Sequence, residues 1–554
     1  YQAGVHGKAA AAGVQEAPRC RDCHGSSHAV VPSGDPASPT HPTKVAETCA
    51  RCHADRALVE RRGIPIPLAF QLYEKSVHAR ALTAGKDAAT CNDCHASHEI
   101  RRATDPESRV YRGNIPNTCG TCHAPETKAY LDSIHGQAVM QGSTGSPVCT
   151  DCHGEHSIRA VQDPESRVSP AAVTRTCAAC HEALRITEKY GLPGGRLATY
   201  EDSFHGLAAR GGNLIAANCA SCHGFHDVRP SRDPQSSIHP ANLPETCGTC
   251  HPGAGENFAR GVIHTSLSAP ANAVLLWVRR FYLLTIVATV GGMLLHNALD
   301  FFGKARRHYR QQAGPAPALE ADHEGGPRRF HLRMAPAERW QHGLLAGSFL
   351  LLVYTGFALT YPEVWLFRWL AALEGGHAWR SWIHRGAALV LLGAAAWHLA
   401  YLASCRGRRF LQDMLPRFQD LREALQNMAY LFGVRREWPA FDRFSYIEKI
   451  EYWAVIWGTV IMAVTGLGLW FETFALRFVP LWVLDLFTLV HFYEAVLASL
   501  AILVWHFYST MFSPGIYPMN WTWITGHVSE DLLRHEHPRE YERLQAAAAV
   551  EEPP

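Results

Sequence analysis

The pattern of apolar and polar positions divides the chain into two unlike parts. Five apolar stretches lie in the second half, at residues 273–298, 342–361, 383–403, 452–471 and 486–511. Each approaches the roughly 20 residues that an α-helix needs to cross a bilayer core of about 30 Å. Five such stretches in a row disfavour the alternative of buried helices in a soluble protein. The pattern therefore predicts a five-helix transmembrane bundle.

Residues 1–270 contain no long apolar run, and their apolar residues are scattered among Gly, Pro and Ser. This pattern predicts short helices and loops with hardly any sheet. We therefore expect a mostly α-helical protein with three parts: a loop-rich domain (1–270), a membrane domain (271–512) and a short tail of mixed charge (513–554). The chain starts at Tyr1 with neither Met nor a signal peptide, and we expect that a signal peptide was removed.

The distribution of basic residues predicts the orientation of the bundle. Residues 303–341 and 404–450 carry eight and nine Lys or Arg, whereas 362–382 and 472–485 carry two and one. Basic links stay in the cytoplasm, which predicts a multi-pass protein of the inner membrane with its N-terminal domain in the periplasm and its tail in the cytoplasm. The net charge of +2 gives no argument for a nucleic-acid partner.

Eight Cys-x-x-Cys-His motifs lie in the N-terminal part. They use 16 of the 17 cysteines: Cys20, Cys23, Cys49, Cys52, Cys91, Cys94, Cys119, Cys122, Cys149, Cys152, Cys177, Cys180, Cys219, Cys222, Cys247 and Cys250. Each pair of thiols can attach one haem, and the next residue can bind its iron: His24, His53, His95, His123, His153, His181, His223 and His251. Zinc sites or disulfides would leave these histidines unexplained. The motifs predict eight covalent c haems, which would supply the missing apolar mass, and leave Cys405 as an inert small residue.

The spacing of the motifs predicts four two-haem modules, because starts 28–29 residues apart alternate with longer gaps. Each module offers two further histidines as second iron ligands: His28, His78, His98, His135, His156, His205, His226 and His264. His6 is an alternative, since it precedes Cys20 as His135 precedes Cys149, and His41 and His239 are further candidates. Met140 is the single methionine of this part, so bis-histidine ligation is expected. Filled axial positions indicate a conduit rather than an active site.

Histidines within membrane spans are costly and usually functional. Six lie in or beside the apolar stretches: His296, His342, His384, His398, His491 and His506. Their depths suit two stacked b haems in a helix bundle. His384 and His491 form the outer pair, while His506 takes either His342 or His398 as its inner partner.

Three segments resemble a known family. Residues 338–362 (ERWQHGLLAGSFLLLVYTGFALTYP) resemble the first membrane helix of the cytochrome b subunits of formate dehydrogenases and nickel–iron hydrogenases. Residues 382–402 (WIHRGAALVLLGAAAWHLAYL) and 491–508 (HFYEAVLASLAILVWHFY) resemble the second and last helices. The resemblance implies His342–His506 for the inner haem and His384–His491 for the outer one. His398 and the helix at 273–298 have no counterpart in it.

The whole chain is similar to fused cytochrome b and multihaem (here octahaem) cytochrome c proteins of quinol-linked respiration and extracellular electron transfer. This resemblance implies electron exchange with a membrane quinone, usually menaquinone. The leading hypothesis is a quinol oxidoreductase that passes electrons to a periplasmic or extracellular acceptor such as another cytochrome. Glu494 is the candidate proton acceptor, and His296 or His398 could serve an inner-face site. The alternatives are quinone reduction in reverse, an electron-wiring subunit bound to partner subunits, and a terminal reductase with an open haem site.

Overall fold

The computed structural model describes residues 1–66, 68–259, 264, 272–313, 329–372, 376–435, 437–514 and 516–551. The chain forms two compact units, residues 1–264 and 265–554, and each is described by itself. The predicted domain border at residue 270 lies outside the described residues. The predicted mostly helical architecture with five long apolar helices is confirmed.

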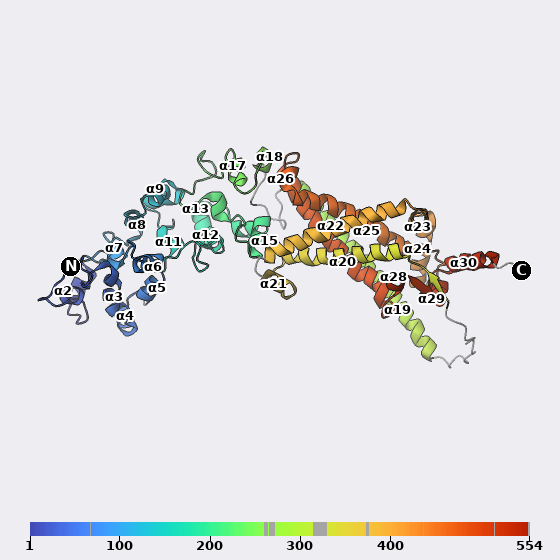
Figure 1. Ribbon diagram of the computed structural model, residues 1–554, viewed down its shortest axis with the longest axis horizontal. Helices are drawn as coiled ribbons and strands as arrows, with labels where there is room; N and C mark the ends of the chain where they lie inside the picture. Colours follow the sequence, from blue (N-terminus) through green and yellow to red (C-terminus); the bar gives the residue numbers. More distant parts are fainter. Residues whose placement is uncertain are drawn as a thin grey trace. The chain divides into compact units, whose positions relative to one another are not determined.

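The N-terminal unit consists of short helices joined by loops (Figure 1). Its helices are α1 (Val5–Ala11), α2 (Cys20–His24), α3 (Pro42–His53), α4 (Arg56–Arg62), α5 (Ala69–Glu74), α6 (Val77–Thr83), α7 (Cys91–His95), η1 (Arg112–Asn114), α8 (Ile115–Gly120), α9 (Ala124–Asp132), α10 (Ile134–Met140), α11 (Cys149–His153), α12 (Val173–His181), α13 (Leu184–Tyr190), α14 (Arg196–Glu201), α15 (Phe204–Arg210), α16 (Cys219–His223), α17 (Leu243–Gly248) and α18 (Glu256–Ala259).

The first Cys-x-x-Cys-His motif of each module forms a one-turn helix: α2, α7, α11 and α16. In α7 and α11 the third residue, Asp93 or Asp151, accepts a hydrogen bond from the backbone N–H that precedes the helix, at 2.7 Å. This bond satisfies a backbone donor that would otherwise be unpaired at the helix start. The residue after the motif histidine has a positive φ, which is favourable for Gly154 but strained for Ala96 (φ 67°).

An Asp-Pro turn precedes the second motif of each module. Asp105 Oδ1 accepts the Glu107 N–H at 3.0 Å, and Arg101 donates to Asp105 Oδ2 at 3.0 Å. These bonds hold the pKa of the Asp105 carboxyl below its usual value. Thr118 Oγ1 then donates to the Arg109 carbonyl at 2.8 Å and anchors the helix that carries the second motif. Asp163 and Asp233 repeat the same turn.

The second unit contains the long apolar helices. They are α19 (Ala273–Ala313), α20 (Pro336–Thr360), α22 (Gly376–Leu402), α25 (Tyr446–Trp470) and α27 (Leu481–Ala501), which continues through the π-helical segments η2 (Ile502–His506) and η3 (Tyr508–Phe512). α20 packs against α22, α25 packs against α27, and α19 packs against α27 and η2. Figure 1 shows α20, α22 and α25 running alongside one another. With five helices able to span a bilayer, this is an integral membrane protein.

Shorter elements gather at the end of the bundle where α22 stops and α25 begins. They are α23 (Cys405–Met414), α24 (Phe418–Leu431), β1 (Phe330–Leu332), α28 (Thr522–Thr525), β2 (His527–Ser529), α29 (Glu530–Glu536) and α30 (Pro538–Glu551). Two further short helices follow α20 and α25 along the chain: α21 (Trp365–Ala372) and α26 (Glu472–Ala475). β1 and β2 pair antiparallel, with His331 opposite Val528. Arg333 contacts Glu448, Glu540 and His537 and so ties the C-terminal segment to α25.

Candidate electron-transfer site

Eight pairs of histidine rings face one another in the N-terminal unit, and each pair contains one motif histidine. The ring centroids lie 6.0 to 6.3 Å apart: His24–His98, His53–His6, His95–His156, His123–His78, His153–His226, His181–His135, His223–His264 and His251–His205. A metal–imidazole bond of about 2.0–2.1 Å on each side, with the half-widths of two rings, spans this separation. The spacing therefore fits one iron atom between each pair.

Each of these pairs, apart from those of His6 and His264, joins two consecutive modules. The first motif histidine of the first module, His24, faces His98 of the second. In the opposite direction, the second motif histidine of the second module, His123, faces His78 of the first. The same two crossings recur between later modules. The modules are therefore interlocked rather than merely adjacent.

His6, the alternative candidate, lies opposite His53, whereas the structure does not bring His28 to a motif histidine within the described residues. The His28 side chain is exposed. By its place in the repeat, His28 corresponds to His98, which serves the preceding module. The further candidates His41 and His239 face no motif histidine in the described part of the chain, and their Nδ1 atoms accept the backbone N–H of Thr43 and Ala241.

A Tyr-x4-His pattern marks the second type of partner histidine, and sequence reasoning overlooked it. Tyr1, Tyr73, Tyr130 and Tyr200 precede His6, His78, His135 and His205. Each tyrosine hydroxyl donates to a backbone carbonyl shortly before the next Cys-x-x-Cys-His motif: Pro18, Ala89, Pro147 and Ala217. The tyrosine thus fixes the histidine-bearing helix against the motif, and Tyr1 places His6 in this class.

Three of these four helices, those of His6, His135 and His205, are tightly packed at their start, whereas the helix of His78 has Ala79 at the equivalent position. In α10 the Ser133 hydroxyl caps the helix by accepting the Gly136 N–H at 3.1 Å. A Cβ added at Gly136 would lie 2.1 Å from the Tyr130 carbonyl oxygen, so only glycine fits after His135. Gly7 and Gly206 show the same close approach after His6 and His205. Backbone packing therefore holds these imidazoles in place.

Burial keeps these imidazoles neutral, as iron ligands must be. Burial, with His181 nearby, lowers the pKa of His135 to about 4. Burial likewise lowers the pKa of His78, with His123 as the second cause. At neutral pH these nitrogen lone pairs are therefore available for a metal.

The motif thiols of successive pairs lie next to one another. Cys49 donates a hydrogen bond to Cys91, and this bond together with burial raises the pKa of the Cys49 thiol. Cys119 donates to Cys149 and Cys177 donates to Cys219, with the same effect on the pKa of each donor. Within modules, Cys94 lies close enough to Cys119 for its pKa to be raised by that thiol, after burial as the larger cause. None of the 17 cysteines, all of which lie among the described residues, forms a disulfide. Among the described residues no three His, Cys, Asp or Glu side chains converge as a zinc site requires.

Two further histidine pairs lie within the helix bundle. His384 and His491 face one another with centroids 6.5 Å apart, and His342 and His506 do so at 6.3 Å. These separations fit an iron atom as the pairs of the first unit do. Of the two partners left open for His506, the structure brings His342 to it and not His398.

A threonine holds each imidazole of the outer pair. Thr355 Oγ1 donates to the Leu351 carbonyl at 2.6 Å and lies 2.8 Å from His384 Nδ1. Because a hydroxyl has a single proton, Thr355 must accept from an Nδ1–H of His384. Thr465 does the same for His491 at 2.9 Å. Both imidazoles are thus fixed in the tautomer that leaves Nε2 free for a metal.

The inner pair uses a carboxylate instead. Glu451 Oε2 lies 3.1 Å from His506 Nδ1, the arrangement of a carboxylate–histidine–metal triad. His506 ends the π-helical segment η2, where the wider i→i+5 winding turns the side chain relative to a regular α-helix. Asn297 of α19 donates to the Val504 carbonyl in this segment. The additional helix α19 therefore supports the segment that positions His506.

The remaining membrane histidines bond to other side chains. His398 Nδ1 lies 2.8 Å from Gln341 Oε1 and its Nε2 lies 2.9 Å from Tyr452 Oη. The His296 ring packs against Trp505 at a tilt of 42°, and its Nε2 lies 3.2 Å from Tyr446 Oη. Neither faces a second histidine in the described part of the chain.

Two buried ionisable residues lie near the outer pair. Glu494 follows His491 by one helical turn, is 8% exposed, and accepts a hydrogen bond from Tyr282 of α19 at 3.0 Å. Arg380, which sequence reasoning did not single out, is also 8% exposed and donates to the Thr355 carbonyl at 3.1 Å. Its Nε has no partner among the described residues. Its other two nitrogens bond to Thr355 and Ser381, so the free Nε of this buried guanidinium next to His384 suits the carboxylate of a haem propionate.

Comparison with known proteins identifies the type of the bundle. Residues 333–518 match the family model of prokaryotic cytochrome b561. This part of the chain is a membrane electron-transfer unit of the cytochrome b561 type. The matched segment holds all four histidines of the facing membrane pairs and excludes α19 and the whole N-terminal unit.

The chain is also similar to the cytochrome b556(Fdn) subunit of the nitrate-inducible formate dehydrogenase of Escherichia coli K12. The two are 23% identical over 216 residues, which cover 39% of this chain and 92% of the relative. The corresponding subunits of Escherichia coli O157:H7 and Shigella flexneri match equally well. The membrane unit is therefore related to the cytochrome b subunits of formate dehydrogenases.

Proposed function

We propose that the chain is a membrane-bound quinol oxidoreductase that passes electrons from a quinol of the menaquinol type, through two b haems and eight c haems, to an acceptor outside the cytoplasm. The observation that carries this proposal is the set of ten facing histidine pairs, eight of which include a Cys-x-x-Cys-His histidine. Bound haem iron supplies one-electron transfer.

The chain's residues hold each c haem from three directions. Two thiols of the motif attach the porphyrin, the motif histidine binds iron from one face, and the facing histidine binds it from the other. The contacts Cys49–Cys91, Cys119–Cys149 and Cys177–Cys219 place the attachment edges of consecutive haems together between modules. Electrons would therefore follow the order of the motifs along the chain. Because a histidine from each side would leave no open position on the metal, these sites would favour electron transfer over substrate chemistry.

Glu494 is the proposed proton acceptor for quinol oxidation. Oxidation of one quinol to quinone releases two electrons and two protons, and a base must take the protons at the site. Glu494 is a buried carboxylate one turn from His491, and Tyr282 holds its Oε2. An ionisable residue within a membrane span is expected to serve such a function.

The positive-inside pattern favours a periplasmic N-terminal unit and an inner-membrane location.

The proposal predicts that the purified full-length protein in nanodiscs oxidises a reduced naphthoquinone analogue and reduces its own c haems, followed by stopped-flow absorbance. Glu494→Gln should slow this reaction about 100-fold, the usual contribution of a general base. Full reduction by dithionite should be unchanged, because no haem ligand is altered. Glu363→Gln, at an exposed carboxylate, is the matched control.

A second candidate function is a wiring subunit, and the relationship to a formate dehydrogenase subunit favours it. In that case the protein alone would not turn over quinol, although dithionite would still reduce every haem. Quinone reduction in the reverse direction would use the same residues. A five-coordinate, high-spin c haem in the oxidised protein would instead support a terminal reductase.

A further inference from the structure

Helix α24 (Phe418–Leu431) is polar on the side that packs against the protein. Lys449 of α25 donates to Asp420 at 2.6 Å, and Arg539 of α30 donates to Glu423 at 2.9 Å. Asn427, one turn further, donates to Tyr446 at 2.9 Å. Glu423 and Asn427 are each 2% exposed. A helix of a soluble domain normally buries its apolar side instead.

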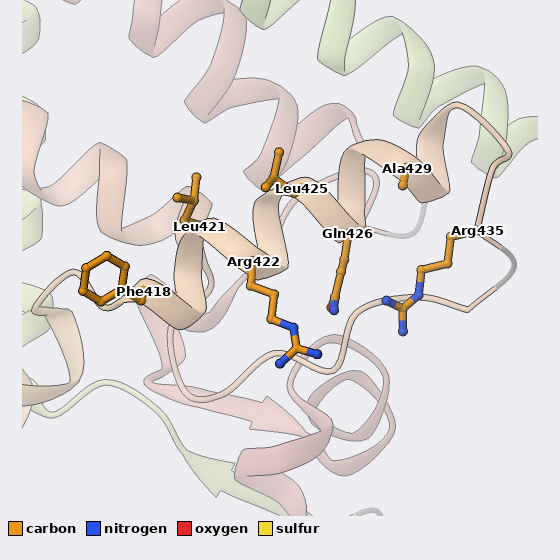
Figure 2. Close-up of a pocket in the computed structure, with 7 residues that line it drawn as sticks. All are labelled: Phe418, Leu421, Arg422, Leu425, Gln426, Ala429 and Arg435. Atoms are coloured by element: carbon orange, nitrogen blue, oxygen red, sulfur yellow. The ribbon is translucent and has the colours of Figure 1, made fainter.

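The opposite side of α24 is apolar and uncovered in this chain. Phe418, Leu421 and Leu425 follow one another at helical spacing and are 95%, 61% and 64% exposed. Phe432, just after the helix, continues the stripe at 59% exposed. Leu421, Leu425, Arg422 and Gln426 line one shallow hollow on this side of α24, with the two leucines along one edge and Arg422 and Gln426 along the other (Figure 2). Polar side chains inside and apolar ones outside are what a lipid environment selects.

The depth of α24 relative to the membrane helices agrees with this. Its inward contacts are to Tyr446 and Lys449, in the first turn of α25. The segment just before α24 reaches deeper, because Trp453 Nε1 donates to the Met414 carbonyl at 2.9 Å. α24 therefore lies level with the first turns of a membrane-spanning helix, where headgroups meet acyl chains.

Charge complements the apolar stripe. The acidic residues of α24 point inward and are paired, whereas Arg417 and Arg422 are exposed beside the stripe. The preceding helix α23 adds the exposed Arg408 and Arg409. The outer surface of this segment is therefore apolar with a positive border, the composition of a helix that lies in an anionic bilayer surface.

We propose that α24 is an interfacial helix whose apolar stripe lies among lipid acyl chains and whose Arg422, beside that stripe, binds the phosphate of an anionic phospholipid. The bilayer is the occupant that the chain itself brings to this face, since α22 and α25 enter it on either side of the α23–α24 segment. The inference stands on contacts around α24 and is independent of haem content and of quinol oxidation.

Photo-crosslinking in native membranes tests which molecule covers the stripe. p-Benzoylphenylalanine in place of Leu425 should yield lipid adducts of the full-length protein, detected by mass spectrometry. The same probe in place of Glu542, an exposed residue of α30, should yield none. Adducts to another protein at position 425 would overturn the proposal, and so would the absence of adducts, which would indicate solvent.

The headgroup contact has its own test. Arg422→Gln should lower the retention of phosphatidylglycerol, measured by native mass spectrometry of the purified protein, about fivefold relative to phosphatidylcholine. Arg422 makes no ion pair among the described residues, so the fold should be unaffected. Arg534→Gln, an exposed arginine of α29, is the control. Equal phosphatidylglycerol retention in all three proteins would contradict a role for Arg422.

Discussion

At the scale of single residues, a tyrosine hydroxyl marks one of the two kinds of partner histidine. Tyr1, Tyr73, Tyr130 and Tyr200 each bond to the backbone shortly before a Cys-x-x-Cys-His motif and hold a histidine five positions later. His6 has this tyrosine, whereas His28 belongs to the class that serves a preceding module. The two histidines therefore differ in function although both lie close to the first motif.

This difference yields a prediction with an internal control. His6→Ala should remove one axial ligand from the iron bound by His53 and convert one low-spin c haem to a high-spin state. His28→Ala should leave every c haem low-spin, because His28 faces no motif histidine in the described residues. Magnetic circular dichroism of the oxidised proteins measures both states. Equal effects of the two substitutions would contradict the pairing.

The motif cysteines and histidines could be proposed from sequence because covalent attachment demands adjacent residues. Six of the eight partner histidines come from a neighbouring module. The spacing along the sequence therefore narrowed the choice of partner for each motif histidine but did not determine it. His28 and His6 illustrate this, since both satisfy the local pattern. The Tyr-x4-His pattern at Tyr1 is present in the sequence. Its role becomes clear only from the structure, in which the Tyr1 hydroxyl donates to the Pro18 carbonyl.

At the scale of helices, the bundle is built from two similar pairs. α20 offers Thr355-Gly356 to His384 of α22, and α25 offers Thr465-Gly466 to His491 of α27. A Cβ at Gly466 would lie 3.1 Å from the His491 ring, so the glycine makes room for the imidazole. The apolar pattern predicted these helices. The roles of the two Thr-Gly pairs, and of α19 packed against α27, become clear only from the contacts between helices.

Removing one of these hydroxyls should change the outer b haem alone. Thr465→Val removes the acceptor of the His491 Nδ1–H, which makes the imidazole less basic and favours ferrous iron. The midpoint potential of the outer b haem should rise, and haem retention should weaken roughly tenfold. Redox titration of the purified protein measures the potential.

Thr488→Val is the matched control, because among the described residues the Thr488 hydroxyl bonds to the Leu484 carbonyl of its own helix and to no histidine. An unchanged outer potential in Thr465→Val, or a shift of the inner b haem of the same size, would argue against this role of Thr465.

At the scale of the whole molecule, two geometries of histidine pairs alternate along the N-terminal unit. The pairs of His24, His95 and His153 have ring planes 16°, 8° and 27° apart. The pairs of His53, His123, His181 and His251 are tilted by 50° to 56°. The last pair, His223–His264, lies between the two classes at 37°. The alternation follows from the two kinds of partner helix and could not be read from the motifs, which are alike.

The angle between axial imidazole planes determines the splitting of the iron d orbitals, so the c haems should form two spectroscopic classes. Electron paramagnetic resonance of the oxidised protein should show two groups of low-spin signals of roughly equal intensity, with the tilted group at lower field. His6→Ala should remove intensity from the tilted group only. A single uniform low-spin signal from all c haems would contradict the alternation.

With c haems bound as proposed, the crossing of partner histidines between modules would also set an order of maturation. A module that had received its haems would still lack one ligand at its first iron until the following module, with its own histidine, had emerged and folded. Its second iron, by contrast, takes a ligand from a segment already made. The ligand sets would therefore be completed in order from the N-terminus. At any time a single haem would be reactive and exposed, with one of its two histidine ligands still missing.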